Sequence, residues 1–311
     1  MKNFNNTYFC KCLSQDIVES KLCSRLTWKN KVYKLINSNG CAFAIKIFLH
    51  DKSDFEDRFQ IELEINKLCK NCYISVPNIK DIGFTQDGDR FILYDWVDGK
   101  SLKCLLLNNK DVGIEIFKKI ISNTQLLNEK RLVNNLFHIK EVERGSLIAH
   151  YLNDCNLDLN KIFNKCRVLD YNLTDLFKQT YFKLLDYVKK SSADNVLINS
   201  DISCKEFIIN KDMYYLDYES YCLGDINVDY AGLFYSSVNG FIDDKFNVDK
   251  YYNFFQQQKS FDNKLFLFYL SERIIMAEVL AQDQVSLEEL KFFINFVLNN
   301  VTKKSKQSIK L

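Results

Sequence analysis

Short β-branched and aromatic runs, broken once by a segment of helical period, fill the first third of the chain. Four of these runs predict strands paired as two hairpins: Val32–Ile36, Cys41–Leu49, Ile79–Phe84 and Arg90–Val97. Within Asp54–Cys72, the residues Ile61, Ile65, Leu68 and Cys72 recur at helical spacing, which predicts one helix between the hairpins. The predicted order is therefore strands, helix, strands.

From Gly99 onward the pattern changes to long stretches of amphipathic helical spacing. The predicted helices are Asp111–Glu129, Leu157–Phe163, Leu173–Lys190, Lys264–Ala281 and Ser286–Asn299. Ser286 and Glu289 have the spacing of a capping box at the start of the last helix. Three very short apolar runs interrupt this helical part and predict strands: Val196–Ile198, Phe207–Ile209 and Tyr214–Leu216. Because short strands in a helical region hold loops rigidly, we expect the chemistry there.

The composition limits the ways in which this chain can bind phosphate groups. Its 311 residues, 47% of them hydrophobic, suffice for one large domain or two unequal lobes. The nine glycines are so far apart that neither G-x-G-x-x-G nor G-x-x-x-x-G-K-[ST] occurs. The dinucleotide fingerprint and the Walker P-loop are therefore excluded.

Charge and cysteine content narrow the class of partner. A net charge of +2, with only seven arginines, argues against a nucleic-acid partner. No apolar run is long enough to span a membrane and no secretory pattern begins the chain, so we expect a cytoplasmic protein without membrane contacts. The eleven cysteines lack a framework spacing and are expected to be reduced. The lone C-x-x-C of Cys69 and Cys72 is interpreted as a pair of small buried residues rather than a metal site.

Two aspartates next to the short strands are the strongest candidates for chemistry. Asp201 lies in the loop after the first short strand, and Asp217 follows the third. In phosphoryl transfer, one carboxylate accepts or orients the hydroxyl group of the acceptor and another holds Mg²⁺. Two aspartates in such loops favour that reaction class.

The residues around these aspartates resemble the aminoglycoside phosphotransferase and choline kinase family. Val196 to Ile209, read as V-L-I-N-S-D-I-S-C-K-E-F-I-I, is similar to its catalytic loop, and Leu216-Asp217-Tyr218-Glu219 is similar to its metal strand. Other segments match in the family's order: Ile45-Lys46-Ile47, Arg90 to Leu102, and Gly224-Asp225 to Ala231. The resemblance implies an α+β, protein-kinase-like fold of two lobes, a small antiparallel-sheet N-lobe with one helix (residues 1–97) and a larger, mainly helical C-lobe (98–311).

The family resemblance also implies roles for individual residues. Asp201 would be the catalytic base or hydroxyl orienter, Asp217 the principal Mg²⁺ ligand, and Lys46 the contact to the α- and β-phosphates of ATP. The remaining cofactor-binding residues are Asn30, in the phosphate-covering segment, and Tyr94, Asp95, Trp96 and Val97, near adenine.

Lys46 also needs a carboxylate partner from the predicted helix. Glu62 and Glu64 flank the stripe formed by Ile61, Ile65 and Leu68 on its two sides. We choose Glu64, which also fits the family's E-x-x-x-L pattern through Leu68, with Glu62 as the close alternative.

Three features depart from the family pattern. The phosphate-covering segment, Ser24–Tyr33, resembles the family's only through Leu26, Asn30 and the Val32-Tyr33 pair. Asn199 stands where the family has histidine, and an asparagine can form hydrogen bonds but cannot titrate. Glu206 occupies the position of the metal-binding asparagine, and we assign it as a possible second Mg²⁺ ligand because carboxylate oxygens suit this ion. Its negative charge beside a triphosphate is the opposite possibility, a weakened nucleotide site.

The sequence therefore predicts an ATP- and Mg²⁺-dependent phosphotransferase that acts on a hydroxyl of an amino sugar, a sugar or a choline-like acceptor. No H-R-D, D-F-G or A-P-E motif is present, which argues against protein substrates. Because of Asn199 and Glu206, two alternatives stay open. One is a degenerate kinase-like protein that serves as an interaction module, and the other is a nucleotidyl-transferring variant.

Overall fold

The structure, a computed structural model, describes residues 17–23, 30–51, 55–131, 136, 138–141, 171–192, 195–280 and 286–301. These residues fall into two compact units. The first comprises Met1–Ser101, Glu129–His138 and Glu206–Ser220, and the second comprises Leu102–Asn128, Ile139–Lys205 and Tyr221–Leu311. The first unit consists mainly of β-strands with one helix, and the second consists mainly of helices.

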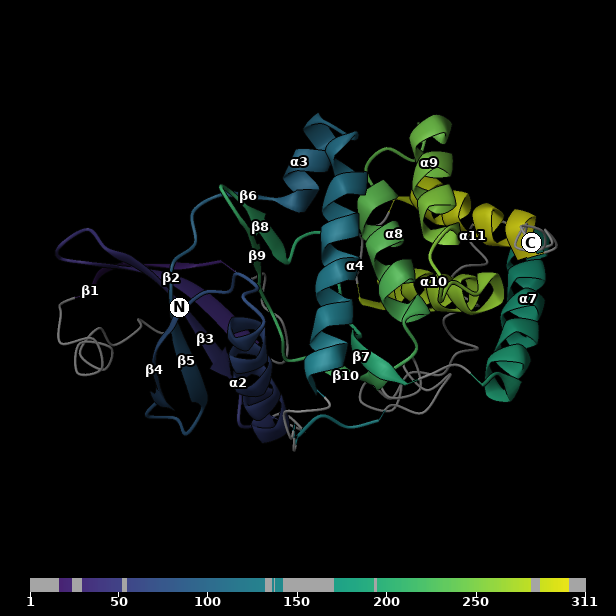
Figure 1. The fold of residues 1–311 in the computed structure, drawn as a ribbon. Helices are drawn as coiled ribbons and strands as arrows, with labels where there is room; N and C mark the ends of the chain where they lie inside the picture. Colours follow the sequence, from purple (N-terminus) through teal and green to yellow (C-terminus); the bar gives the residue numbers. More distant parts are fainter. Residues whose placement is uncertain are drawn as a thin grey trace. The chain divides into compact units, whose positions relative to one another are not determined.

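The first unit contains a five-stranded antiparallel sheet in the order β1-β2-β3-β5-β4 (Figure 1). Its strands are β1 (Ile17–Leu22), β2 (Asn30–Asn37), β3 (Ala42–Phe48), β4 (Ile79–Phe84) and β5 (Arg90–Asp95). The turn between β2 and β3 has Gly40 at φ 77°, and the turn between β4 and β5 has Gly88 at φ 87°. Both are left-handed conformations that glycine adopts without steric cost, which explains how the two hairpins close.

Both faces of the central strands β3 and β5 are buried. Ile45 and Ile47 pack on one face with Leu35 and Phe91, whereas Phe48 packs on the other face with residues of helix α2 (Phe55–Asn71). Figure 1 shows α2 alongside the sheet, and its contacts are to β3 and β5. Because side chains alternate along a strand, Lys46 lies on the face that α2 covers.

A second, three-stranded sheet in the first unit has the order β6-β8-β9. It consists of β6 (Lys100–Ser101), β8 (Phe207–Ile209) and β9 (Met213–Tyr215). Gly99 precedes β6, and a Cβ atom at this position would lie 2.7 Å from the carbonyl oxygen of Ile209. The close approach of β6 to β8 therefore requires a glycine there.

The second unit is mainly helical. Its helices are α3 (Leu102–Asn108), α4 (Val112–Arg131), α7 (Tyr171–Lys190), α8 (Asn227–Val238), α9 (Lys245–Gln256), α10 (Asn263–Leu280) and α11 (Leu287–Val301). The last three residues of α4, from Glu129, are assigned to the first unit. The short strands β7 (Val196–Asn199) and β10 (Tyr221–Gly224) pair antiparallel. Helix α10 packs against α7, α8 and α11 and so forms the centre of this unit (Figure 1).

Aromatic rings fill the core between these helices. Phe234 of α8 packs edge-on against Phe255 and Phe266 and at a tilt against Tyr252 and Phe296, at centroid distances of 5.1 to 6.4 Å. All five rings are buried. Such pairs contribute about 0.5–1.5 kcal/mol each beyond the burial of their area. The aromatic residues of α9 and α10 therefore form the core.

Most elements expected from the sequence pattern are present. Both hairpins, helix α2, the three short strands and the helices α4, α7, α10 and α11 lie within a few residues of their predicted bounds. The expected helix Leu157–Phe163 and positions 24–29 of the phosphate-covering segment lie outside the described residues. Strand β1 was not expected because only Ile17 in it is buried, and α8 was not expected because buried residues surround it on all sides.

Two findings bear on the setting of the protein. None of the described helices is long and apolar enough to cross a membrane. The described cysteines are free thiols, and Cys69 and Cys72 are both buried, which agrees with their interpretation as small core residues.

The capping box at α11 gives a first test. Oγ of Ser286 accepts the N–H of Glu289 at 3.1 Å, and the N–H of Ser286 donates to Oε2 of Glu289 at 3.2 Å. We expect Ser286→Ala to lower the free energy of unfolding by about 1 kcal/mol because the N–H of Glu289 loses its side-chain acceptor. Denaturant titration measures the change, and Ser286→Asp should restore most of it. A Ser286→Ala protein as stable as the parent would show that this cap contributes nothing.

Candidate nucleotide and metal centre

The centre of the candidate site is the ammonium group of Lys46. This residue lies in β3, its side chain is only 6% exposed, and Nζ lies 3.0 Å from Oε2 of Glu62, 2.5 Å from Oδ1 of Asp217 and 3.0 Å from Oε2 of Glu219. A buried ammonium is tolerated only when it is paired and hydrogen-bonded. The three carboxylates supply that pairing and come from α2 and from the segment after β9.

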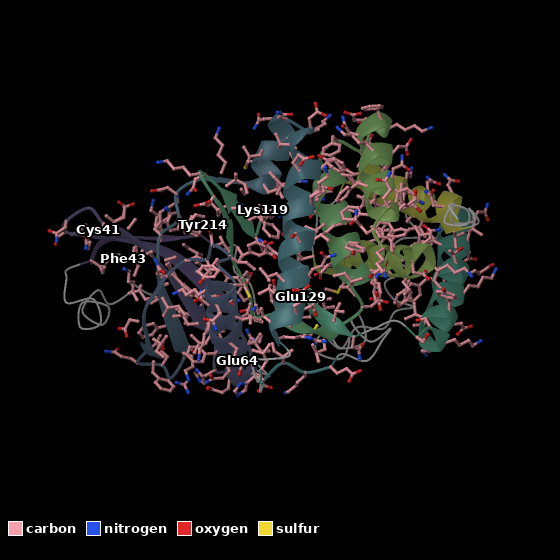
Figure 2. The ribbon with its side chains drawn as sticks, viewed as in Figure 1. Cys41, Phe43, Glu64, Lys119, Glu129 and Tyr214 are labelled. Carbon is pink, nitrogen blue, oxygen red and sulfur yellow. The ribbon has the colours of Figure 1, made fainter. Side chains whose placement is uncertain are left out.

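Glu62, not the predicted Glu64, is the partner of Lys46 from α2. Glu62 is 2% exposed, and its two oxygens accept hydrogen bonds from Nζ of Lys46, from the hydroxyl of Tyr94 at 2.8 Å and from the N–H of Tyr218 at 2.8 Å. Glu64, labelled on α2 in Figure 2, instead lies 2.7 Å from Nδ1 of His138. The choice of Glu64 as the partner of Lys46 was therefore wrong.

The error has a physical cause in the shape of the buried face of α2. The sequence argument counted only the stripe of Ile61, Ile65, Leu68 and Cys72. Phe59 and the polar Asn66 are also buried, on the other side of Glu62. These residues move the centre of the buried face close to Glu62. At about 100° per residue, Glu64 points roughly 160° away from Glu62 and so faces out of the sheet contact.

Asp217 differs from its neighbours in exposure and backbone conformation. Its side chain is 48% exposed, whereas Glu62 and Glu219 are almost fully covered. Its φ of 61° is left-handed, a conformation that costs most non-glycine residues energy and is tolerated best by Asp and Asn. The turn at Asp217 thus leaves a carboxylate accessible at one end of a buried ion cluster.

Glu206 lies at the open end of the β8–β9 hairpin. Its carbonyl oxygen accepts the N–H of Leu216 at 2.8 Å, which continues the register that pairs Phe207 with Tyr215. The backbone at Glu206 is therefore next to the residue that precedes Asp217.

Glu219 is a site residue that the sequence assignment left out, although it stands in the quoted D-x-E motif. It accepts a hydrogen bond from Nδ2 of Asn30 at 2.7 Å, and NH1 of Arg58 lies 3.8 Å away. Asn30, predicted to touch the nucleotide, is buried at the start of β2 and bound to Glu219. The spacing of two residues from Asp217 was the signal that could have identified Glu219.

Burial and charge oppose one another in this cluster. Burial alone would lower the pKa of Lys46, but Asp217, Glu219 and Glu62 raise it well above its usual value. For Glu62, burial raises the pKa, Lys46 opposes this effect, and the neighbouring carboxylates add to it. Lys46 is thus firmly protonated, and the cluster of three carboxylates keeps a surplus of negative charge.

This donor set suits a divalent cation. Among the described residues, Glu62, Asp217 and Glu219 form a group in which one oxygen from each side chain lies within 4.8 Å of the others. Mg²⁺ binds carboxylate oxygens and keeps several waters, so one accessible carboxylate and one nearby are sufficient protein ligands. Asp217 is the accessible member, while Glu62 is occupied by Lys46, Tyr94 and Tyr218.

The segment predicted to lie near adenine follows β5. The hydroxyl of Tyr94 points to Glu62, so this side chain belongs to the Lys46 cluster. The N–H of Asp95 donates to Asn78 O at 2.9 Å, and its carboxylate pairs with Lys80. The ring N–H of Trp96 donates to Asp98, and Nζ of Lys34 lies 4.4 Å from the centroid of the Trp96 ring. Among the described residues, no contact of Val97 tests its predicted role near adenine.

Asp201 belongs to the second unit, where it follows β7. Its side chain is 60% exposed, and its carboxylate accepts a hydrogen bond from NH1 of Arg273 at 3.0 Å. Oδ1 of Asn199 accepts the N–H of Asp201 at 3.2 Å, and the N–H of Asn199 lies 3.4 Å from Oδ2 of buried Asp229. Asn199 therefore shapes the loop through hydrogen bonds, which need no titratable group.

By sequence, the chain matches no protein-family model and no curated protein. Several solved structures are nevertheless similar to this chain in fold. An apo thermostable mutant of aminoglycoside phosphotransferase APH(4)-Ia has a TM-score of 0.68 over 96% of this chain and 100% of its own, at 9% identity.

Two ligand-bound structures are similar as well. The GDP and kanamycin complex of APH(2")-IIIa has a TM-score of 0.66, 15% identity, and coverage of 94% of this chain and 97% of its own. Spectinomycin phosphotransferase APH(9)-Ia, with ADP and spectinomycin, has a TM-score of 0.57, 15% identity, and coverage of 96% and 98%. The predicted two-lobed, kinase-like fold is confirmed, with an N-terminal five-stranded sheet carrying one helix and a helical C-lobe.

The Lys46 cluster predicts a pH-dependent effect of its removal. Lys46→Met removes the cation that opposes the effect of burial on Glu62, so the pKa of this buried carboxylate rises further above its usual value in the folded state. A group with a raised folded-state pKa is stabilising at low pH, and this stability is lost as the pH rises through that pKa. We expect a loss of about 3 kcal/mol in the free energy of unfolding near pH 8 and a smaller loss near pH 5.

The matched control is Lys31→Met on the neighbouring strand. Lys31 is in register with Ile47 and so lies on the opposite face of the sheet from Lys46. Denaturant titration of both variants at the two pH values measures the difference. A penalty for Lys46→Met that is independent of pH, or equal to that of Lys31→Met, would contradict the cluster's electrostatic role.

Proposed function

We propose that this chain is an ATP- and Mg²⁺-dependent phosphotransferase that acts on a hydroxyl group of a small molecule. The observation that carries the proposal is the buried Lys46–Glu62 pair beside the accessible carboxylate of Asp217. Phosphoryl transfer in kinase folds depends on a lysine held by a helix carboxylate and on an aspartate that binds the metal. The kinase-like fold of the chain supports the same proposal.

Each residue of the cluster takes one part in nucleotide binding. Lys46 binds the α- and β-phosphates, Glu62 holds its ammonium in place, and Asp217 is the principal metal ligand, with Glu219 beside it. Bound Mg²⁺ would neutralise charge on the phosphate oxygens. Glu206 is proposed as a second ligand because its backbone lies next to the Leu216–Asp217 segment.

Asp201 is proposed as the residue that receives the acceptor. The acceptor oxygen forms a bond to the γ-phosphorus, the bond between that phosphorus and the β,γ-bridging oxygen breaks, and ADP leaves. The hydroxyl proton passes to the carboxylate of Asp201. Since Arg273 donates a hydrogen bond to this carboxylate and holds its position, we assign Asp201 mainly the task of orienting the hydroxyl.

The acceptor and nucleotide follow from the resemblance and the similar structures. Amino sugars, sugars and choline-like alcohols are the acceptors that the family resemblance implies. Kanamycin and spectinomycin are bound in two of the similar structures, with GDP and ADP respectively. Nucleotide binding near Tyr94 to Val97 and Asn30 completes the proposed site.

Two other functions remain in competition. A degenerate kinase-like protein is favoured by Asn199 and Glu206 and by the ion pair that occupies Asp201. A nucleotidyl-transferring variant would use the same phosphate centre but release pyrophosphate. Product analysis separates the three, because only phosphotransfer yields ADP and a phosphorylated acceptor.

ATP turnover against an acceptor panel, with Mg²⁺ or Mn²⁺, tests the proposal. We expect Asp217→Ala to abolish turnover and Asp201→Asn to reduce kcat by at least about 10²-fold, the scale of general acid–base and positioning effects. Glu206→Asn should retain activity, since an asparagine oxygen can also bind the metal, whereas Glu206→Ala should lose it.

Exposed Asp212, in the turn of the β8–β9 hairpin, supplies the control. Asp212→Asn makes the same chemical change as Asp201→Asn and should leave kcat unchanged. The proposal fails if no acceptor gives turnover and Mg-ATP produces no shift in thermal stability.

A further inference from the structure

A pocket beside Asp201, within the helical unit, has a volume of about 300 Å³. Its described lining comes from the loop after β7, from α3, α8 and α10, and from Asn239 at the end of α8. Ligand pockets range from about 300 to 1,000 Å³, so this pocket is at the small end and suits a molecule of one sugar ring. Whatever binds there presents its groups directly to Asp201.

The charge of this lining is positive. Lys103, Lys205 and Arg273 contribute three cations, and among the described lining residues Asp201 is the only acid. Arg273 donates to Asp201 at 3.0 Å, so the single negative charge is already paired. The surplus charge belongs to the two lysines.

Lys103 keeps its charge without a carboxylate at hydrogen-bond distance in the part of the chain that the structure describes. Its Nζ donates to Ser236 O at 2.9 Å, to Asn239 O at 3.2 Å and to Asn239 Oδ1 at 2.9 Å, all neutral oxygens. Burial lowers the pKa of Lys103, the nearby Cys204 and Glu289 oppose this effect, and the positive charge of Lys205 adds to it. An anion in the pocket would relieve this repulsion.

The close packing of α8 against α10 fixes the position of the Arg273 side chain. Its NH2 donates to Ser200 O at 2.6 Å, and a Cβ atom at Gly232 of α8 would lie 3.0 Å from that nitrogen and 2.7 Å from Ile202 O. Only glycine leaves this space. A guanidinium has five N–H donors, and the bonds to Asp201 and Ser200 use only a part of them, so with respect to the described residues Arg273 has donors left for a ligand.

From this geometry we propose that the pocket beside Asp201 binds a small hydroxyl acceptor carrying an anionic group, a carboxylate or a phosphate, and disfavours cationic acceptors. The inference rests on the proposed function, since it takes Asp201 as the residue that receives the hydroxyl. Exposed Lys205 and the remaining donors of Arg273 bind the anionic group, and the charge of Lys103 adds to their attraction.

The opposite charge would be rejected for the same reasons. An ammonium group in the pocket would compete with Arg273 for Asp201 and would be repelled by Lys103 and Lys205. Like charges placed together discriminate strongly between partners. The choice among the acceptors implied by the family resemblance therefore moves away from amino sugars and choline and toward acidic or phosphorylated sugars.

The test uses four ligands that share one ring and differ in charge: glucose, glucuronate, glucose phosphate and glucosamine. Calorimetric titration into the full chain without nucleotide measures binding, and Mg-ATP turnover is measured separately. We expect the two anionic sugars to bind at least about tenfold more tightly than glucose, and glucosamine to bind more weakly than glucose. Tighter binding of both anionic sugars would show that the pocket recognises negative charge in general. Tighter binding of only one would show that it recognises a carboxylate or a phosphate in particular.

Lys205→Glu should abolish the preference for anions. The matched control is Lys119→Glu on α4, an exposed lysine outside the pocket lining that is labelled in Figure 2, and it should keep the preference. Binding that favours glucosamine, an anion preference unchanged in Lys205→Glu, or no binding by any of the four sugars would overturn the inference. Anion binding without turnover would support the pocket and count against the proposed reaction, so the two failures are distinguishable.

Discussion

The burial of one ammonium group constrains much of the first unit. Lys46 is on the helix-covered face of β3, and its charge can remain there only because Glu62, Asp217 and Glu219 surround it. The hydroxyl of Tyr94 and the N–H of Tyr218 then complete the hydrogen bonds of Glu62. Sheet, helix α2 and the segment after β9 are thus joined by charges rather than by apolar packing alone. A nucleotide with its metal would enter a centre whose geometry is already fixed.

In the second unit, the loop that carries Asp201 is fixed by hydrogen bonds from side chains and backbone groups on β7, α8 and α10. Asn199 accepts the N–H of Asp201, Asp229 accepts from Asn199, and Arg273 binds Ser200 O. Burial raises the pKa of Asp229, while the N–H of Asn199 and the charge of Arg273 oppose that effect. Asn199 is therefore compatible with an ordered loop, because its contacts are hydrogen bonds made by its backbone N–H and by its side-chain oxygen.

The spacing of apolar residues predicted the helices and strands that have one polar and one apolar face. It failed for elements whose faces are equally apolar. The hairpins, α2 and the capping box of Ser286 followed from local pattern, whereas α8, buried on all sides, has no polar face to mark its period. The motifs singled out Asp201, Asp217 and Lys46 as candidates, but Glu62 was ranked behind Glu64 since the helix face was judged from apolar residues alone. Its burial depends on the pairing with Lys46, an interaction sixteen residues apart that only the tertiary structure brings together.

The binding of Mg-ATP to Glu62→Gln and Glu64→Gln tests the central claim most directly. Both variants lose one carboxylate from the same helix, but only Glu62 contacts Lys46. The account predicts that Glu62→Gln weakens Mg-ATP binding by at least about tenfold, since an unheld lysine must be reoriented on binding. Glu64→Gln should bind Mg-ATP as the parent protein does. Equal affinities for the two variants, or a larger loss in Glu64→Gln, would contradict the assignment of the Lys46–Glu62 pair as the nucleotide centre.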